Sequence, residues 1–340
     1  MDRAFPFDQD EFQWRDGERT VLFGKDRLGD VAETLADRGW ERYELLTTRR
    51  ALGDAPVALA DGAVAVHQLP AGGVPAISAD LLERVSVPTL VALGGGRVID
   101  SAKAVAAVRG GRVCAIPTTL SGAPMTTIHR LPEGAQAPHL VRPQLVLADP
   151  EQMTAQPEER MRASAMNALA HGSDSLYTPL ANPVSRQAGL SGARLIATSL
   201  DQEPGARDRS ALALGALLCA FALDSALFSL HHVICQTLVR VLEIPHAETN
   251  ATILPRAMEA LRGHAPEAVA ALAVALGTTP AEIGSRIEDL GGGPRRLSDL
   301  GADRGRLDEA IDAIMERGEL RMTPDAPDRA GILQLIEAAW

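Results

Sequence analysis

Residues 89–119, TLVALGGGRVIDSAKAVAAVRGGRVCAIPTT, decide the fold. Thr89–Leu93 is an apolar run typical of a buried strand, and it leads directly into the turn Gly94-Gly95-Gly96. A helical pattern follows from Val98 to Val108, and a second short strand is predicted at Val113–Ile116. Strand, turn, helix and strand together form one βαβ unit, which favours a parallel sheet with helices on its faces.

The first 150 residues continue this alternation of strands and helices. Further strands are predicted at Thr20–Phe23, Tyr43–Thr47, Ala63–Gln68 and Leu145–Leu147, and an amphipathic helix at Asp30–Arg38. After Asp149-Pro150 the pattern becomes helical throughout. Helices are expected at Pro157–Tyr177, Pro183–Thr198, Arg207–Val241, Asn250–Leu261, Pro266–Leu276 and Leu307–Arg317, with a helix start at Ser298. We therefore expect an α/β domain in residues 1–150, a helical domain in residues 151–340, and an active site in the cleft between them.

Composition narrows the class of protein. Aromatic residues make up only 3% of the 340 residues, so the core must consist mainly of Ala, Leu and Val, which favours helices and α/β layers. The net charge of −11 argues against nucleic acid or an anionic membrane as a partner, because neutralising phosphates requires a basic field.

The chain is expected to be a cytoplasmic protein. Its three cysteines, Cys114, Cys219 and Cys235, lie in apolar runs without metal-type spacing, which indicates reduced core residues. The first residues, MDRAFPFDQDEFQW, are acidic and lack the apolar region of a secretory signal. The longest apolar run, residues 211–223, is too short to span a bilayer and is interpreted as a buried helix.

The glycine turn is a candidate anion site. Backbone amides at a helix N-terminus bind anions, and glycine lets a phosphate approach them closely. The turn is not the G-x-G-x-x-G fingerprint, so a plain tight turn is the alternative, with Asp100 and Lys103 as a solvated pair. Thr118 and Thr119, at the end of the next predicted strand, add hydroxyls at the same sheet edge, where ligands of parallel sheets bind.

Three histidines in otherwise apolar sequence form a second candidate site: His171, His232 and His246. Imidazole is the commonest metal ligand and the commonest acid or base near neutral pH. His171 lies one turn after Asn167, with Asp174 three residues further on the same helix face. The alternative for each is a core histidine with satisfied hydrogen bonds. The remaining histidines are expected to be structural (His231) or to lie on the surface or in loops (His67, His129, His139 and His264).

Four motifs in order along the chain resemble the iron-containing (group III) alcohol dehydrogenase superfamily: GGGRVIDSAKAVA, AIPTTLSGAPMT, NALAHGSDSLYTPLANPVSRQA and LHHVICQTL…IPHAETNATILP. Within it, Asn167, the LHH at 230–232 and the PHAET at 245–249 are most similar to the maleylacetate reductase branch. The resemblance covers nearly the whole chain. It implies a dinucleotide-binding N-terminal domain, a helical C-terminal domain that holds the metal or substrate, and a homodimer.

The resemblance also implies which residues bind NAD or NADP. The turn Gly94-Gly95-Gly96 would hold the pyrophosphate, with Asp100 and Lys103 completing the motif. Thr118, Thr119 and Ser121 would contact the adenine and nicotinamide ends. Arg97 replaces the usual Ser, and it would either pair with a phosphate or block the usual pose.

In metal-dependent members of this superfamily an Asp and three His bind the ion. The matching residues here are Asn167, His171, His232 and His246. They could hold Zn²⁺ or Fe²⁺, but an amide is a weaker ligand than a carboxylate, and the reductase branch is often regarded as metal-free. Without metal, the same groups would donate a proton and polarise a carbonyl.

Two further positions bear on specificity. Gln236 stands where the family has a second helix histidine thought to relay protons, and Val239-Arg240 replaces a Gly-Gly pair, so the substrate is expected to differ. The segment Thr47-Thr48-Arg49-Arg50 has no immediate carboxylate to select NAD, and its arginines would tolerate the 2′-phosphate of NADP, unless they are plain surface residues.

We expect an NAD(P)-dependent oxidoreductase that transfers hydride between nicotinamide and a small carboxylated carbonyl, enoate or hydroxy compound. His232 and His246 would polarise or protonate the oxygen, while His171 and Asn167 would hold it. One alternative is a biosynthetic tailoring dehydrogenase that oxidises a β-hydroxy acid, such as a peptide's C-terminal threonine, with decarboxylation. Another is a non-redox lyase or cyclase, or a degenerate family member.

Overall fold

The computed structural model describes residues 12–137 and 139–340. The chain divides into two compact units, residues 1–156 and residues 157–340. The expectation that the chain lacks a secretory signal depends largely on residues 1–11, which lie outside the described residues.

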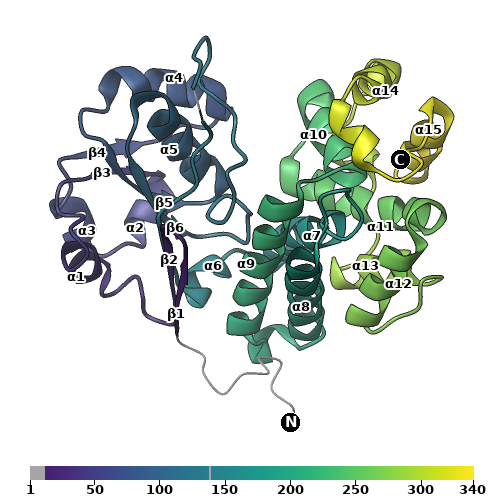
Figure 1. Ribbon diagram of the computed structural model, residues 1–340, viewed down its shortest axis with the longest axis horizontal. Helices are drawn as coiled ribbons and strands as arrows, with labels where there is room; N and C mark the ends of the chain where they lie inside the picture. The colour runs from purple at the N-terminus through teal and green to yellow at the C-terminus, as the bar shows by residue number, and fades with distance from the viewer. Residues whose placement is uncertain (1–11, 138) are drawn as a thin grey trace. The chain divides into compact units, whose positions relative to one another are not determined.

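The first unit is built on one sheet of seven strands (Figure 1). The strands are β1 (Phe12–Asp16), β2 (Arg19–Phe23), β3 (Glu44–Thr47), β4 (Ala65–Gln68), β5 (Thr89–Gly94), β6 (Arg112–Pro117) and β7 (Leu145–Ala148). They lie in the order β1-β2-β7-β6-β5-β3-β4, and all neighbours are parallel except the β1–β2 hairpin. The predicted parallel sheet is confirmed, and β1 is an additional edge strand.

Strands β5 and β6 bring the two predicted cofactor segments together. Both are central and almost entirely buried, in keeping with their continuous apolar sequence. In their register Leu93 pairs with Ile116 and Gly94 pairs with Pro117. The glycine turn and Thr118 therefore leave the sheet side by side at its carboxyl edge, as the sequence predicted.

Helices cover both faces of this sheet (Figure 1). They are α1 (Val31–Ala36), α2 (Arg49–Gly53), α3 (Val57–Asp61), α4 (Val74–Arg84), α5 (Gly96–Arg109) and α6 (Pro150–Met153). One core cluster joins residues of α1, α2 and α3 to alternate residues of the strands, among them Leu45, Val91 and Ile116. Helix α5 packs on β5 and β6 and also against α4. The helices α2, α3, α4 and α6 were not predicted from the sequence.

The second unit is helical, as expected. Its α-helices are α7 (Glu158–Asp174), α8 (Pro183–Leu200), α9 (Arg209–Ala226), α10 (Leu230–Leu242), α11 (His246–His264), α12 (Pro266–Ala275), α13 (Ile283–Leu290), α14 (Leu307–Met315) and α15 (Arg329–Ala338). Four short 3₁₀ turns join them: η1 (Pro204–Ala206), η2 (Leu297–Leu300), η3 (Arg304–Arg306) and η4 (Gly318–Met322). Helix α7 lies inside this unit and packs against α8, α9, α10 and α11.

The prediction of one continuous helix over 207–241 is wrong. The chain breaks after α9 and resumes at Leu230. Leu227 adopts a positive φ of 58°, a conformation that a leucine rarely takes, so sequence periodicity gave no sign of the break. The break separates α9 from the helix that carries His231 and His232.

Helices α8 and α9 approach each other closely through glycines. A Cβ added at Gly192 would lie 2.6 Å from the Cys219 sulfur and 2.7 Å from the carbonyl oxygen of Gly215. Helix α9 is long and apolar enough to cross a membrane by length and composition alone, but 72% of its apolar window is buried inside the structure. It is a core helix here, as its sequence predicted.

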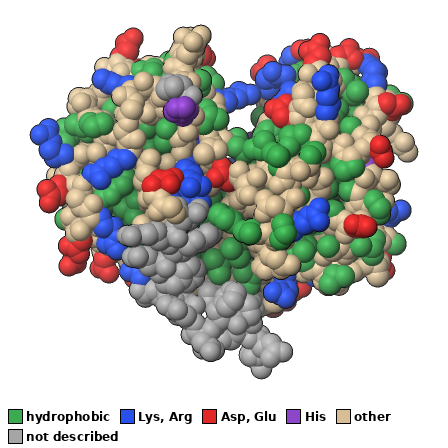
Figure 2. Space-filling model, in the orientation of Figure 1, with side chains coloured by type: hydrophobic (Ala, Val, Ile, Leu, Met, Phe, Trp, Pro, Cys, Tyr) green, Lys and Arg blue, Asp and Glu red, His purple; other side chains and the backbone are tan. Residues whose placement is uncertain are grey.

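The surface mixes the two signs of charge. Figure 2 shows acidic and basic side chains interspersed over the visible face, with apolar side chains between them. Several arginines pair with neighbouring carboxylates, among them Arg84 with Asp80 and Arg329 with Asp308. The excess of acid in the composition therefore does not form a single-sign field on this face.

Candidate active site

The glycine turn connects β5 to α5 and is closely packed. Gly94 ends the strand, Gly95 caps the helix, and Gly96 is its first residue. A Cβ at Gly95 would lie 2.9 Å from Cγ2 of Thr119, and one at Gly96 would lie 3.2 Å from Oγ of Ser121. A side chain at Gly95 would displace Thr119, and one at Gly96 would press against Ser121. The first backbone N–H groups of a helix have no partner within the helix, which makes this end of α5 suitable for an anion.

Two hydroxyls beside the turn lack partners. Thr119 Oγ1 and Ser121 Oγ are buried and make no hydrogen bond within the protein. Buried hydroxyls are normally satisfied, so an unpartnered pair beside a helix N-terminus is what a bound phosphate would explain. Both residues were predicted as cofactor ligands, and the structure places them against Gly95 and Gly96.

A cavity of about 150 Å³ opens at the same sheet edge. Its walls come from the ends of β3, β5 and β6, from α2, and from α6 and the segment after it: Thr48, Arg50, Ala51, Asp54, Leu93, Thr118, Thr119, Gln152, Ala155 and Gln156. Gln156 adds a third buried polar atom without a partner, its Nε2. The cavity is lined mainly by polar side chains, and its size and position suit part of a nucleotide.

Three predicted cofactor residues have other surroundings. Lys103 is buried, and its Nζ donates to Asp100 Oδ1 at 2.8 Å and to the carbonyl oxygens of Ala123 and Ile128. This lysine holds the segment 123–128 against α5, and Asp100 serves as its counter-charge. Arg97 has an exposed side chain.

Three of the four residues predicted for this site, Asn167, His171 and His232, are buried among the inner helices of the second unit, whereas His246 is exposed at the start of its helix. His171 and Asn167 come from α7 and His232 from α10, while His246 begins α11. The rings of His171 and His232 stack at 4.9 Å between centroids with an interplanar angle of 16°. Asn250, one turn into α11, donates from Nδ2 to Nε2 of His246 at 3.3 Å and to its carbonyl oxygen at 2.7 Å.

Several polar atoms of this cluster have no partner. Asn167 Oδ1, His171 Nδ1, His232 Nε2 and Asn250 Oδ1 are buried and make no hydrogen bond within the protein. Burying a polar atom without a partner costs free energy, so the four atoms indicate a ligand, substrate or ion that completes them. The interpretation of these histidines as satisfied core residues does not fit His171 and His232.

Burial favours the neutral form of His171 and of its neighbour His231. It lowers the pKa of His171 well below 6.5, and the neighbouring His232 lowers it further. Burial also lowers the pKa of His231 to about 3, with His232 as the second cause. A neutral imidazole has one nitrogen with a free lone pair, which can ligate a cation or accept a proton.

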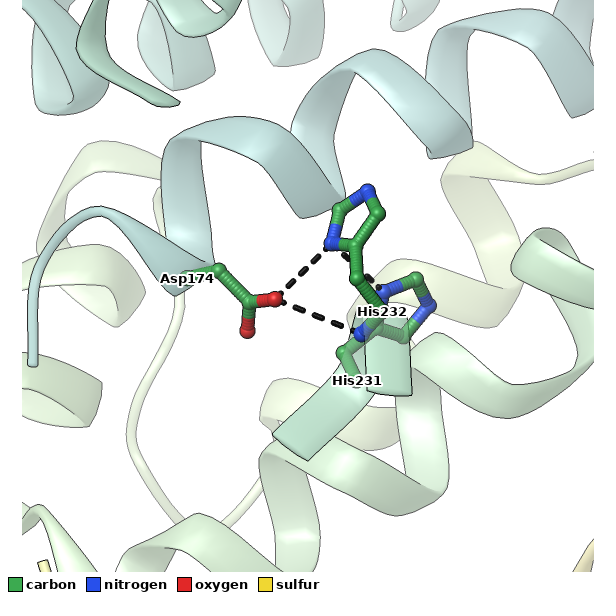
Figure 3. A group of neighbouring side chains, drawn as sticks. All are labelled: Asp174, His231 and His232. Carbon is green, nitrogen blue, oxygen red and sulfur yellow. Dashed lines mark hydrogen bonds and ion pairs between the residues drawn. The ribbon is translucent and has the colours of Figure 1, made fainter. Parts of the chain in front are cut away.

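Asp174 was not among the predicted site residues, and His231 was expected to be structural. Among the described residues, Asp174, His231 and His232 are the group of three whose ligand atoms lie within 4.8 Å of one another (Figure 3). Hydrogen-bond distances join Asp174 to His232 and His232 to His231 within this group. Burial raises the pKa of Asp174, but hydrogen bonds and charge from His232 outweigh it and hold the pKa at about 2.

Gln236 has a charged neighbour that the sequence did not reveal. It lies one turn after His232, and its Oε1 accepts from Arg317 Nη2 at 3.1 Å. Arg317 also pairs with Glu319 through both of its carboxylate oxygens. The side chain of Gln236, which stands where the family has a histidine, is therefore hydrogen-bonded to an arginine.

His67 is not a surface residue, contrary to the prediction. It is buried beside Glu44 on the adjacent strand, and its Nε2 lies within hydrogen-bond distance of the Glu44 carboxylate. The two residues are 23 positions apart, so only the β3–β4 pairing brings them together. Their role is structural.

Comparison with known proteins identifies one family across both units. Residues 161–340 match the C-terminal part of the Fe-containing alcohol dehydrogenase family, and residues 23–131 match an iron-containing alcohol dehydrogenase profile. Maleylacetate reductase 1 of Rhodococcus opacus is 32% identical over 350 residues, covering 97% of this chain and 96% of its own.

A second relative and a solved structure agree. A maleylacetate reductase of Pseudomonas sp. (strain P51) is 32% identical over 312 residues, covering 87% of this chain and 88% of its own. The crystal structure of maleylacetate reductase from Agrobacterium tumefaciens matches with a TM-score of 0.83 and 27% identity, covering 98% of each chain. These matches confirm the resemblance that the sequence motifs carried.

Proposed function

The chain belongs to the iron-containing alcohol dehydrogenase family, and we propose that it reduces a small unsaturated oxo acid of the maleylacetate type. It is an NAD(P)-dependent oxidoreductase of the alcohol dehydrogenase and maleylacetate reductase type. The substrate class is the proposal. The observation that carries it is the stacked pair His171 and His232, each with a buried ring nitrogen that lacks a protein partner.

The reaction balances with one nicotinamide and one proton. The reduced nicotinamide, when bound, supplies a hydride to the carbon β to the ketone, and a proton adds to the α carbon, leaving the saturated oxo acid and NAD(P)⁺. His232 and His246 polarise the keto oxygen or donate the proton, while His171 and Asn167 hold the oxygen in place. Burial of Asn167, His171 and His232 limits the access of water to the polarised oxygen, whereas His246 is exposed.

The polar atoms of the first unit fit the dinucleotide. Gly95, Gly96, Thr119 and Ser121 would hold its diphosphate, and the cavity lined by Thr48, Arg50 and Asp54 would take one end. Arg50 favours acceptance of the 2′-phosphate of NADP. Asp54, which also lines this cavity, would favour the free hydroxyl of NAD, so we propose that both cofactors are accepted.

The residues also fit a divalent ion. Asn167, His171, His232 and His246 would hold it, and three of them offer buried atoms with no other partner. In that position the ion would act as a Lewis acid on the substrate oxygen. All four donors are uncharged, which weakens binding relative to a site with a carboxylate.

Loss of reduced-nicotinamide absorbance with maleylacetate tests the proposal directly. The wild-type chain should consume one NADH or NADPH per substrate, and His232→Gln should lower kcat about 100-fold or more. His264→Gln, at the end of α11 and away from the cluster, is the matched control and should leave kcat unchanged. Failure of both NADH and NADPH to bind would overturn the redox assignment altogether.

The pair Gln236 and Arg317 favours one second candidate. The Arg317 guanidinium donates to Gln236, which lies one turn after His232, and a guanidinium that exchanged its Glu319 partner for a substrate carboxylate would suit the oxidation of a β-hydroxy acid. NAD(P)⁺ would take the hydride from the hydroxyl carbon, the hydroxyl proton would leave, and the β-keto acid would lose CO₂. Release of CO₂ together with NAD(P)H from a β-hydroxy acid or a peptide ending in threonine would support this candidate over the reductase.

We further propose a cytoplasmic homodimer without nucleic-acid or membrane partners. The supporting observations are the three free buried cysteines, the net charge of −11 and the mixed charges of the visible surface. Light scattering of the purified protein should give twice the 35.9 kDa chain mass. A monomer at assay concentration would contradict the dimer.

A further inference from the structure

Asp174, the last residue of α7, is completely buried and receives four hydrogen bonds. The Tyr177 hydroxyl donates to Oδ1. The other oxygen, Oδ2, lies 3.2 Å from the backbone nitrogen of Ser229, 3.3 Å from that of His232 and 2.8 Å from His232 Nδ1. The backbone N–H groups can only donate, so Oδ2 must be an acceptor.

It follows that Nδ1 of His232 carries a proton. A ring nitrogen 2.8 Å from an oxygen that accepts two other hydrogen bonds must itself be a donor. Figure 3 shows the carboxylate of Asp174 facing this edge of the ring. The break between α9 and α10 makes the contact possible, because Ser229 and His232 at the start of α10 turn their N–H groups toward Asp174.

His231 supports the same assignment independently. Its Nε2 lies 3.2 Å from the carbonyl oxygen of Asn250, which can only accept, so the His231 proton is on Nε2. Its Nδ1 is then a lone pair, and it lies 3.4 Å from Nδ1 of His232. Two lone pairs facing each other at this distance would repel, so His232 Nδ1 must carry the proton.

The opposite nitrogen of His232 is then the free one. Its Nε2 is buried and has no protein partner. The ring is held between His171, stacked at 4.9 Å, and His231, whose ring meets it edge to face at 4.9 Å, while Phe228 lies 5.8 Å away. The packing and the hydrogen bonds therefore fix both the orientation and the tautomer of the His232 ring.

We infer that Asp174 is a positioning residue that holds His232 as the Nδ1–H tautomer and thereby directs Nε2 to the substrate oxygen. The group Asp174, His231 and His232 is thus a hydrogen-bonded support rather than a set of ion ligands, because both oxygens of Asp174 are already occupied by donors. Carboxylates behind functional imidazoles act in this way in many enzymes. The direction of Nε2 to substrate rests on the proposed function, whereas the tautomer does not.

The tautomer can be measured in the full chain. Long-range ¹H–¹⁵N spectra of protein labelled at histidine distinguish a protonated ring nitrogen from a bare one, and His232→Gln identifies the signals of residue 232. In the wild type we expect Nδ1 of His232 protonated and Nε2 bare. The reverse pattern would overturn the inference without any variant of Asp174.

Two substitutions separate the acceptor from a general structural role. Asp174→Asn keeps an oxygen acceptor facing the two backbone N–H groups, so it should retain the Nδ1–H tautomer and much of the activity. Asp174→Ala removes the acceptor and should give a mixture of tautomers, with kcat for maleylacetate reduction about 10- to 100-fold lower and KM for NADPH unchanged. Tyr177→Phe, which removes only the bond to Oδ1, is the control and should keep the tautomer.

The outcomes are distinct. Equal activity and unchanged tautomer in Asp174→Ala would overturn the positioning role. If Asp174→Ala does not fold, the wild-type and Asp174→Asn spectra still decide the tautomer. If the wild type shows the expected tautomer but does not turn over maleylacetate, the proposed substrate is wrong and the support by Asp174 stands.

Discussion

At position 167 the chain has Asn, a neutral amide, where metal-dependent members of the family have the carboxylate of Asp. Asn167 lies on α7 one turn before His171, and its Oδ1 has no partner. The side chain can ligate through this oxygen, but it adds no negative charge to a site made of neutral imidazoles. The affinity for a divalent ion should therefore be limited by this one residue.

Asn167→Asp should convert the cluster into a stronger metal site. A carboxylate at the same position adds charge and a better ligand, so affinity for Zn²⁺ or Fe²⁺ should rise at least ~10-fold. Metal analysis after dialysis checks the result, with Asn167→Ala as the matched control. Without metal, the variant should melt below the wild type, because the new carboxylate is buried and unpaired, and added metal should reverse the difference. Equal metal content in the wild type and Asn167→Asp would contradict the argument.

The buried histidines make the fold sensitive to acid. The pKa of His231 falls from 6.5 in the unfolded chain to about 3 in the fold, and the pKa of His171 is also lowered well below 6.5. Above pH 6.5 both states are neutral at these residues and the full stability is present. As the pH drops below 6.5, these histidines are protonated in the unfolded chain but stay neutral in the folded chain, so the free energy of unfolding decreases.

The melting temperature should fall between pH 7 and pH 5. The shift of His231 alone removes roughly 2 kcal/mol over this interval, or roughly 4–8 °C in melting temperature, and the lowered pKa of His171 adds to the loss. His231→Gln keeps a donor for the Asn250 carbonyl but cannot be protonated. Between pH 7 and pH 5 its melting temperature should therefore fall less than that of the wild type, by the contribution of His231. His139→Gln, at an exposed position, is the control and should follow the wild type. A flat profile for the wild type would refute the effect.

At the scale of elements, the β5–α5 turn is the part of the cofactor site that depends most on shape. Gly95→Ala would place a Cβ 2.9 Å from Thr119 Cγ2, so the threonine must move and the backbone approach to a phosphate is blocked. Affinity for NADH and NADPH should fall at least ~10-fold by fluorescence titration, with little change in the helical unit. Gly134→Ala is the control for a glycine-to-alanine change in a turn with open space around it, although its φ of +72° adds local strain. Unchanged cofactor affinity in Gly95→Ala would remove the turn from the site.

The elements that the sequence predicted are those with strong local patterns. The strands around residues 89–117 were predicted because buried parallel strands are apolar without interruption. The break at Leu227 was missed because a leucine with positive φ is selected by tertiary packing and leaves no mark in periodicity. The residues of the candidate site also divide into those that local sequence predicts and those that only tertiary packing brings together. Thr119 could be predicted from its place after a strand and Ser121 from the family motif, whereas the contact of Asp174 with Ser229 joins residues 55 apart and required coordinates.

At the scale of the whole molecule, the chain has two units with separate cores. In the first, Glu44 is buried on β3, and its carboxylate accepts from Ser86 N at 2.7 Å and Ser86 Oγ at 2.6 Å as well as contacting His67. Burial raises the pKa of Glu44, but these hydrogen bonds outweigh it and leave the pKa lowered. In the second, Gly192 allows α8 and α9 to touch. Each residue stabilises contacts within its own unit.

Substitutions at these two positions should therefore act on different parts of the chain. Glu44→Gln weakens charge-assisted hydrogen bonds and should cost about 1–3 kcal/mol, while Gly192→Ala forces apart two packed backbones at a similar cost of about 1–3 kcal/mol. Because cooperative opening follows contiguous cores, hydrogen exchange should accelerate over residues 19–148 in the first variant and over residues 158–338 in the second. The double variant should show both patterns, each close to that of its single variant. Acceleration across the entire chain in either single variant would mean that the two units unfold as one cooperative body, and the stability of the imidazole cluster would then depend on the sheet as much as on its own helices.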